Sequence, residues 1–143
     1  MPCVAAMSRF YNTANARRGI LTRMEDAKTY EGSCHCGNVR YEVTMTPPAK
    51  AFAGTCSICS RTGWLLAFVP ASQVKFLSGD DGTSDYQFGK KSVHHHFCSK
   101  CGVRSFSRGQ DKSGNETIAV NLRCLGGLDA TKLPVETFDC AKL

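Results

Sequence analysis

The sequence lacks long apolar runs. No stretch approaches the roughly 18 consecutive apolar residues that indicate a membrane span, so we expect neither a membrane partner nor a hydrophobic secretory signal. Sustained helical periodicity is also scarce, which argues against a helical bundle. The chain has 143 residues, 42% of them hydrophobic, and is therefore long enough to bury the core of one globular domain.

Acidic residues are missing from the first 24 positions, which contain four arginines and carry a charge of +4. Because the formal net charge of the chain is +6, the remaining 119 residues carry only +2. Nucleic-acid binding calls for a basic face rather than a basic tail, so we do not expect a nucleic-acid partner. Residues 1–28 are predicted to be a basic extension, either a transit peptide or an over-extended gene start, and residues 29–143 one domain.

Short β-like runs, separated by turns rich in Gly, Pro, Ser and Asp, follow from Thr29 onward. The run NVRYEVTM (38–45) places Val39, Tyr41, Val43 and Met45 on one side, which is the period of two of a half-buried strand. Further strands are predicted at 50–55, 64–70, 73–79, 84–89, 92–98, 103–109 and 116–122. Many short strands with intervening turns predict a mainly β fold of small antiparallel sheets.

Cysteine is abundant, with nine residues, and six of them form close pairs. Such pairs present two sulfurs to one metal more readily than they join distant segments through disulfides. We therefore expect reduced thiols and a cytoplasmic location. The alternative is a disulfide-rich secreted module.

Two of the pairs, Cys34-x-Cys36 and Cys98-x-x-Cys101, are each followed by glycine. A glycine at this place lets the backbone turn so that its amides point at the sulfurs, as in zinc knuckles. Four thiolates are enough for one tetrahedral structural zinc, which would join the first strand region to a late hairpin. The alternative is two unrelated pairs, buried or oxidised.

The third pair, Cys56-x-x-Cys59, belongs to a larger pattern. In order and spacing, the motifs GSCHCGNVRYEV, CSICSRTG, HHFCSKCGVRSF and VNLRCL…LPVETFD resemble those of the glutathione-dependent formaldehyde-activating family, which includes the centromere protein V domain. The resemblance covers about residues 29–140. It implies a zinc-stapled β-tent fold, with structural zinc on the two outer pairs and a second zinc on a middle C-x-C-x-x-C. Cys56 and Cys59 match the last two of those cysteines, whereas Gly54 stands where the first is expected.

The resemblance also implies a carbon–sulfur lyase that forms or cleaves S-hydroxymethylglutathione, with Cys56 and Cys59 holding the catalytic zinc. Candidates for the missing third ligand are His35, His94, His95, His96, Cys124 and Cys140. Candidates to bind the carboxylates of glutathione are Arg61, Arg104 and Arg123, and Trp64 could form a wall of the pocket.

Other interpretations of the third pair stay open. It could be a metal-free dithiol in a turn or a redox C-x-x-C pair, although no βαβ pattern surrounds it. If the pair is a metal-free dithiol, the second metal site has degenerated, and the protein is a zinc-stabilised binding module without catalytic activity.

Overall fold

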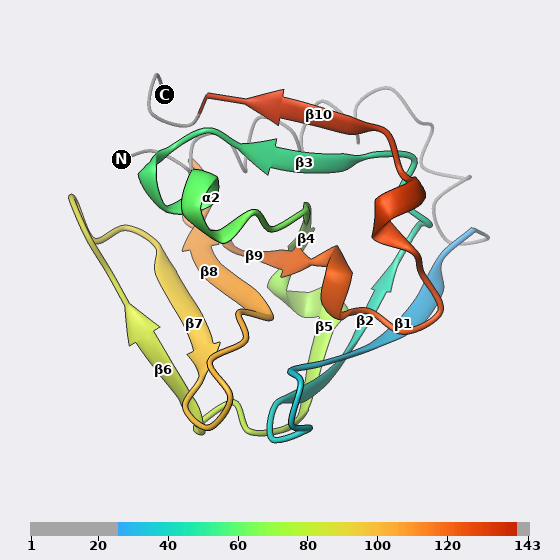
Figure 1. The fold of residues 1–143 in the computed structure, drawn as a ribbon, viewed down its shortest axis with the longest axis horizontal. Helices are drawn as coiled ribbons and strands as arrows, with labels where there is room; N and C mark the ends of the chain where they lie inside the picture. The colour runs from blue at the N-terminus through green and yellow to red at the C-terminus, as the bar shows by residue number, and fades with distance from the viewer. Residues whose placement is uncertain (1–25, 140–143) are drawn as a thin grey trace.

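Two β-sheets make up the protein in the computed structural model, which describes residues 26–139 (Figure 1). The smaller sheet is antiparallel, with the order β1–β2–β5. Its strands are Lys28–Ser33 (β1), Arg40–Met45 (β2) and Val74–Ser78 (β5). The larger sheet has the order β10–β3–β4–β9–β8–β7–β6. In that order its strands are Val135–Phe138, Ala51–Gly54, Leu66–Pro70, Glu116–Asn121, Phe106–Gln110, His94–Cys98 and Thr83–Tyr86.

Helical structure is short in the described part of the chain. One α-helix, α2 (Ser57–Thr62), follows β3. Three 3₁₀ turns are η2 (Ala71–Gln73), η3 (Leu122–Cys124) and η4 (Ala130–Lys132). Over residues 26–139, no helix has the length and apolar character needed to cross a membrane.

The prediction of a mainly β fold is confirmed. The eight predicted strands correspond to β2 through β9, and β2 alternates as expected, with Tyr41, Val43 and Met45 buried. Two strands, β1 and β10, were not predicted. All neighbouring strands pair antiparallel except β10, which runs parallel to β3.

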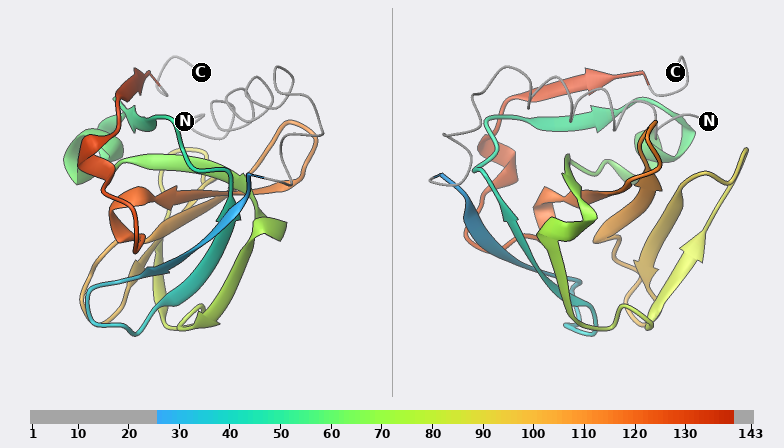
Figure 2. Two further views of the ribbon diagram at one scale, coloured as in Figure 1. Left: turned by 90° about the vertical axis from the view of Figure 1, so that its right-hand side faces the viewer. Right: turned by 180° about the vertical axis from the view of Figure 1, so that it is seen from behind.

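The two sheets lean against each other like the sides of a tent (Figures 1 and 2). Along one edge the β1–β2, β5–β6 and β7–β8 turns lie together, at the bottom of Figure 1. The main core fills the space between the sheets, where the side chains of Tyr41, Val43, Val120 and Leu122 are almost completely excluded from solvent. Burial of this kind contributes about 25 cal/mol per Å² of apolar surface and holds the two sheets together.

A second, smaller cluster lies beneath α2, on the other side of the larger sheet. It combines Cys56, Cys59 and Trp64 with a set of apolar side chains: Phe52, Ile58, Leu66, Phe68, Phe88, Ala119 and Phe138. Three aromatic pairs tie it together: the ring centroids lie 5.8 Å apart for Phe52 and Phe68, 5.9 Å for Phe68 and Phe138, and 6.4 Å for Phe52 and Phe138. The middle cysteine pair is therefore part of a packed apolar region.

Candidate metal centre

The four outer cysteines converge at the edge where the sheet turns meet. Cys34 and Cys36 lie in the β1–β2 turn, Cys98 ends β7, and Cys101 lies in the β7–β8 turn. Their sulfurs all lie within 4.8 Å of one another. The Cys36 sulfur is 3.7 Å from the sulfurs of both Cys34 and Cys98. Zinc–thiolate bonds of about 2.3 Å in a tetrahedron place two sulfurs about 3.8 Å apart, so these distances suit a four-thiolate metal site.

The two turns that carry these cysteines have the same backbone design. Cys34 N–H donates to the Val39 carbonyl at 3.1 Å, and Cys98 N–H donates to the Val103 carbonyl at 3.0 Å. The glycine after each pair adopts a positive φ, 81° at Gly37 and 78° at Gly102, where a side chain would be strained. Both glycine positions therefore have the conformation expected of zinc knuckles.

Amide groups surround the sulfurs and orient them. Val39 N–H donates to the Cys34 sulfur at 3.3 Å, and the N–H groups of Lys100 and Cys101 donate to the Cys98 sulfur at 3.4 and 3.5 Å. The side-chain amide of Asn38 reaches the same sulfur at 3.8 Å, from the opposite turn. Hydrogen bonds to the ligand atoms fix their direction and stabilise negative charge on sulfur. No local sequence pattern indicates this role of Asn38, because it depends on a contact between the two turns.

The pKa values of the Cys36 and Cys98 thiols are shifted in opposite directions. The backbone N–H of Cys101 is the strongest influence on Cys98 and lowers the pKa of its thiol to about 6. The N–H of Asn38 lowers the pKa of Cys36, but desolvation and the thiols beside it outweigh this effect, so that its pKa is raised to about 11. Thiolates this close repel one another, and a bound divalent cation is what allows all four to be ionised together.

The middle pair lies on α2, where the sequence analysis allowed a turn. Cys56 is the N-cap residue of this helix and Cys59 lies in its first turn, and both are buried, at 8% and 5% exposure. The helix ends at Gly63, which has a φ of 65°. Residues three apart on a helix share a face, so both thiols point into the aromatic cluster beneath α2.

Gly54 ends β3 next to this pair. A Cβ atom at position 54 would lie 2.7 Å from the Cys59 sulfur and 3.4 Å from the Phe138 ring. Protein atoms do not approach so closely without displacement, so the Cys59 side chain uses space that a side chain at position 54 would need. Glycine at position 54 thus leaves room for the Cys59 side chain in its present position.

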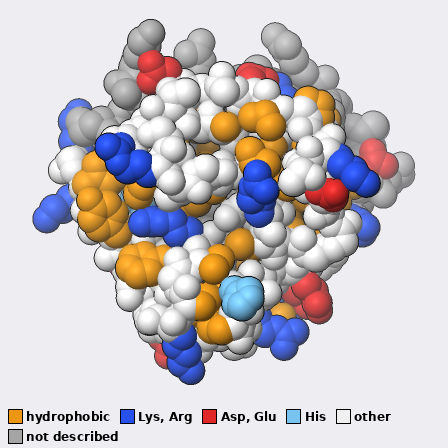
Figure 3. All heavy atoms as spheres, in the orientation of Figure 1, with side chains coloured by type: hydrophobic (Ala, Val, Ile, Leu, Met, Phe, Trp, Pro, Cys, Tyr) orange, Lys and Arg blue, Asp and Glu red, His pale blue; other side chains and the backbone are white. Residues whose placement is uncertain are grey.

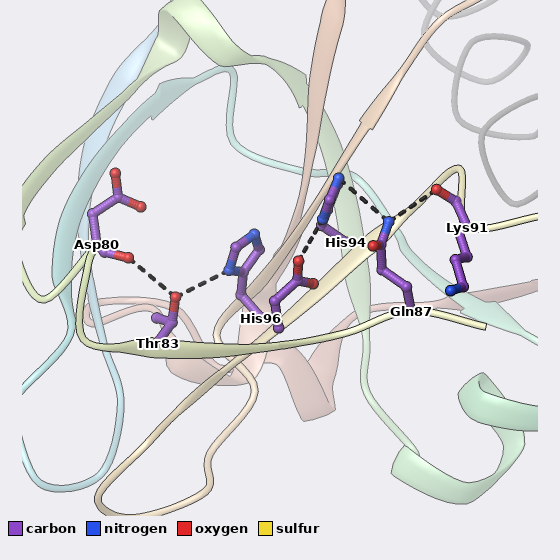
Figure 4. Close-up of polar contacts among 7 residues, drawn as sticks. Asp80, Thr83, Gln87, Lys91, His94 and His96 are labelled. Carbon is purple, nitrogen blue, oxygen red and sulfur yellow. Dashed lines mark hydrogen bonds and ion pairs between the residues drawn. The ribbon is translucent and has the colours of Figure 1, made fainter.

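The three consecutive histidines alternate across β7, as expected for a strand. His94 and His96 share the face on the main-core side of the sheet, where the His96 ring stacks on Phe106 with centroids 4.9 Å apart. The His94 Nδ1 lies 2.5 Å from Asp85, and the His96 Nδ1 lies 3.0 Å from the Thr83 hydroxyl (Figure 4). His95 faces the other way and is buried beside Trp64, with ring centroids 6.0 Å apart. Only His95 adjoins the aromatic cluster that contains the middle cysteines.

Two other candidates for a third ligand, His35 and Cys124, do not adjoin this cluster. His35 is exposed in the β1–β2 turn, and the Cys124 thiol lies 3.8 Å from the Arg104 carbonyl. Cys140 falls outside the described residues. Between residues 26 and 139, the outer four cysteines are the only group of three or more Cys, His, Asp or Glu side chains spaced to hold a metal.

Comparison with known proteins decides the family. The model for glutathione-dependent formaldehyde-activating enzymes matches residues 29–140. The chain belongs to this family. A protein of Halomonas elongata that is named for the same activity is 34% identical over 79 residues, which are 50% of this chain and 50% of that protein. The chain thus spans about half the length of the curated relative that it matches.

A solved structure has a similar fold. The crystal structure of a Rhodobacter sphaeroides protein superimposes with a TM-score of 0.64 and 32% sequence identity. The match covers 74% of this chain and 99% of that chain. The formaldehyde-activating family and its mainly β fold are therefore established for this sequence.

In this member of the family, the three arginine candidates have different environments. Arg61 is exposed and donates to the Ser57 carbonyl of its own helix at 2.8 Å, and Arg123 is exposed at η3. Arg104 is partly buried over the Phe97 ring, 5.4 Å from its centroid, and desolvation lowers the pKa of its guanidinium. Its Nη1 is buried and has no hydrogen-bond partner among the described residues. Arg104 is therefore the candidate with a donor to offer.

A second buried donor lies over the same face of β7. The indole Nε1 of Trp64 has no hydrogen-bond partner among residues 26–139. Trp64 packs against His95 and Arg104 against Phe97, and residues two apart on a strand share a face. The outer surface around α2 also carries Lys and Arg side chains among apolar ones, with acidic side chains nearer the rim (Figure 3). Buried donors of this kind are suited to an anionic or carbonyl-bearing ligand.

Proposed function

We propose that the protein is a zinc-dependent carbon–sulfur lyase that forms or cleaves S-hydroxymethylglutathione. The observation that supports this proposal best is the buried dithiol of Cys56 and Cys59, which lies in an apolar, aromatic region of a chain that belongs to the formaldehyde-activating family. On this proposal the outer four cysteines hold a structural zinc, and the dithiol contributes two ligands to a second zinc.

The proposed reaction involves no oxidation. In the forward direction the glutathione sulfur forms a bond to the carbonyl carbon of formaldehyde, and the proton of the thiol ends on the oxygen, which becomes a hydroxyl group. The reverse direction breaks the same C–S bond. A zinc ion, when bound, lowers the pKa of a thiol and polarises an oxygen.

The chain's own side chains would position the substrate. Glutathione carries two carboxylates, and the buried Nη1 of Arg104 supports a charge-assisted hydrogen bond to one of them. The Trp64 indole N–H supports a second contact. The surrounding rings of Phe88 and Phe97 would exclude water and thereby strengthen both contacts.

The proposed location is the cytoplasm. Cys34, Cys36, Cys98, Cys101 and Cys124 are not in disulfides. Thiols persist in this state in a reducing compartment, where glutathione is also abundant.

The second candidate function is a binding module that contains zinc but has no activity. The observation in its favour is Gly54, because the first ligand of the family motif is missing and the Cys59 side chain uses the space. On this alternative, the outer cysteines keep their structural role and the dithiol has none in catalysis.

Activity of matched variants separates the two candidates. S-hydroxymethylglutathione formation would be followed with the purified protein, with Cys59→Ser and with Cys124→Ser, which also removes one thiol but lies outside both cysteine groups. The lyase proposal predicts that turnover is lost in Cys59→Ser and retained in Cys124→Ser. Full turnover in Cys59→Ser, or none above the uncatalysed rate in the unaltered protein, would refute it.

A further inference from the structure

We propose that Tyr86 and Arg104 together bind one carboxylate of the thiol substrate, so that the site selects thiols that carry an acid group. The inference rests on the proposed function only in taking a glutathione-like thiol as the ligand. Arg104 offers a buried donor to this carboxylate. Tyr86, the last residue of β6, adds a hydroxyl group from the edge strand beside β7.

Arg104 lacks a carboxylate partner within the protein. Arg108, which also stacks on aromatic rings, is paired with Asp80 at 2.7 Å and with Glu116 at 3.1 Å. By contrast, no Asp or Glu in the described part of the chain forms an ion pair with Arg104. A partly buried guanidinium without a counter-ion is costly, because its charge is withdrawn from water and is not neutralised. An anionic ligand would supply the missing partner.

Tyr86 lies on the same face of the larger sheet as the Arg104 side chain. It is paired with His95 across β6 and β7, so these two side chains point to one side of the sheet. Phe97, which contacts the Arg104 guanidinium, is two residues further along β7 and shares that side. Diagonal neighbours of this kind are about 7–8 Å apart, within the reach of aromatic and long side chains. A carboxylate between Tyr86 and Arg104 can therefore contact both.

The Tyr86 ring is held in place without being covered. It stacks on Phe88, with ring centroids 5.9 Å apart, and Phe88 belongs to the aromatic cluster that contains Cys56 and Cys59. Even so, Tyr86 is 49% exposed. The phenol also acts on Arg104: burial is the larger influence and lowers the pKa of the guanidinium, whereas Tyr86 raises it. The two groups are therefore neighbours, beside the region that contains the dithiol.

Two donors on one carboxylate would make the site selective for acids. Hydrogen bonds to a charged acceptor are roughly twice as strong as neutral ones, and esterification removes this charge. An ester would also leave the partly buried guanidinium without a counter-ion. We therefore expect the protein to bind an acid more tightly than the ester of the same compound, which aromatic packing alone would not achieve.

The test is calorimetric binding of S-methylglutathione and of its diethyl ester to the zinc-loaded full chain. The sulfur of both probes carries a methyl group, so binding is measured without turnover. We expect the unaltered protein to bind the acid about tenfold or more tightly than the ester. The control Tyr30→Phe, which removes a phenol from the smaller sheet, should keep this preference. Tyr86→Phe should weaken binding of the acid by about tenfold and leave binding of the ester unchanged.

A double variant shows whether both residues contact the same carboxylate. Tyr86→Phe in the Arg104→Gln background should weaken acid binding by less than about threefold, because the carboxylate has already lost its main partner. Losses that multiply would assign the two residues to separate contacts and overturn the inference. Equal losses of acid and ester binding in Tyr86→Phe would also overturn it, since the ring would then only support the packing. So would the absence of any preference for the acid in the unaltered protein.

These outcomes are distinct from those of the lyase proposal. If Tyr86→Phe binds the acid as tightly as the unaltered protein, and the unaltered protein turns over S-hydroxymethylglutathione, the inference is wrong and the lyase proposal stands. If acid binding depends on Tyr86 and Arg104 while S-hydroxymethylglutathione is not turned over, the lyase proposal fails and the carboxylate site stands.

Discussion

Replacing Cys98 with serine should remove a large part of the stability of the fold. A metal held by Cys36 and Cys98 cross-links positions that are 62 residues apart and that belong to different sheets. Closing a loop of about 62 residues restricts the unfolded chain by about 4 kcal/mol at 25 °C. Domains of this size have total unfolding free energies of about 5–15 kcal/mol, so the loss brings the protein close to unfolding.

Urea denaturation provides the assay, since Trp64 is the single tryptophan and is buried at 4% exposure. Its fluorescence should report a much lower denaturation midpoint for Cys98→Ser, with a urea dependence at least as steep, because the unfolded chain is no longer restricted by the metal cross-link. Cys124→Ser, which removes a thiol outside the metal cluster, should cost about 1 kcal/mol. Equal midpoints for the two variants would refute the reasoning, because the Cys98 sulfur would then contribute no more than an ordinary thiol.

Three further predictions concern the core and the proposed substrate contact. Gly32→Ala should lower the free energy of unfolding, measured by urea denaturation, by about 2 kcal/mol, because its Cβ would overlap the buried Tyr41 ring. The control Gly126→Ala, whose Cβ would have its nearest neighbour at 3.6 Å, should change this free energy by less than about 0.5 kcal/mol. Burial raises the pKa of Tyr41 well above 10, so the stability that its neutral hydroxyl contributes is complete below pH 10 and is lost as the pH rises further. In Tyr41→Phe, the urea midpoint should therefore decline less steeply at alkaline pH. Arg104→Gln should raise KM for S-hydroxymethylglutathione by about 10- to 100-fold, whereas the control Arg61→Gln, at an exposed position, should raise it by less than about twofold. Equal KM values in the two variants would exclude Arg104 as a carboxylate contact.

The outer metal cluster was predictable from sequence because its ligands come from two turns with the same local pattern. Each turn has two close cysteines and then a glycine, and each closes with the same backbone hydrogen bond. The period of two in residues 38–45 likewise predicted β2, since alternation reports directly which side chains face the core. Local patterns of this kind are visible in sequence without knowledge of the partner segment.

The missed features depend on contacts distant in sequence or are too short to show a pattern. Helix α2 has six residues, fewer than two turns, so no period of 3.6 could be seen. Strand β10 has four residues with an exposed Val135, and its pairing is with β3, which precedes it by about eighty residues. Alternation along β7 separates His95 from His94 and His96, but only the packed sheet shows that His95 is the buried one.

The measurement that tests the central claim most directly is zinc X-ray absorption spectroscopy on the variant in which both Cys56 and Cys59 are replaced by serine. This variant keeps the four cysteines whose sulfurs lie within 4.8 Å of one another. We predict one zinc ion per chain with four sulfur neighbours at about 2.3 Å. A folded variant that contains no zinc, or zinc bound by nitrogen and oxygen instead of four sulfurs, would contradict the account.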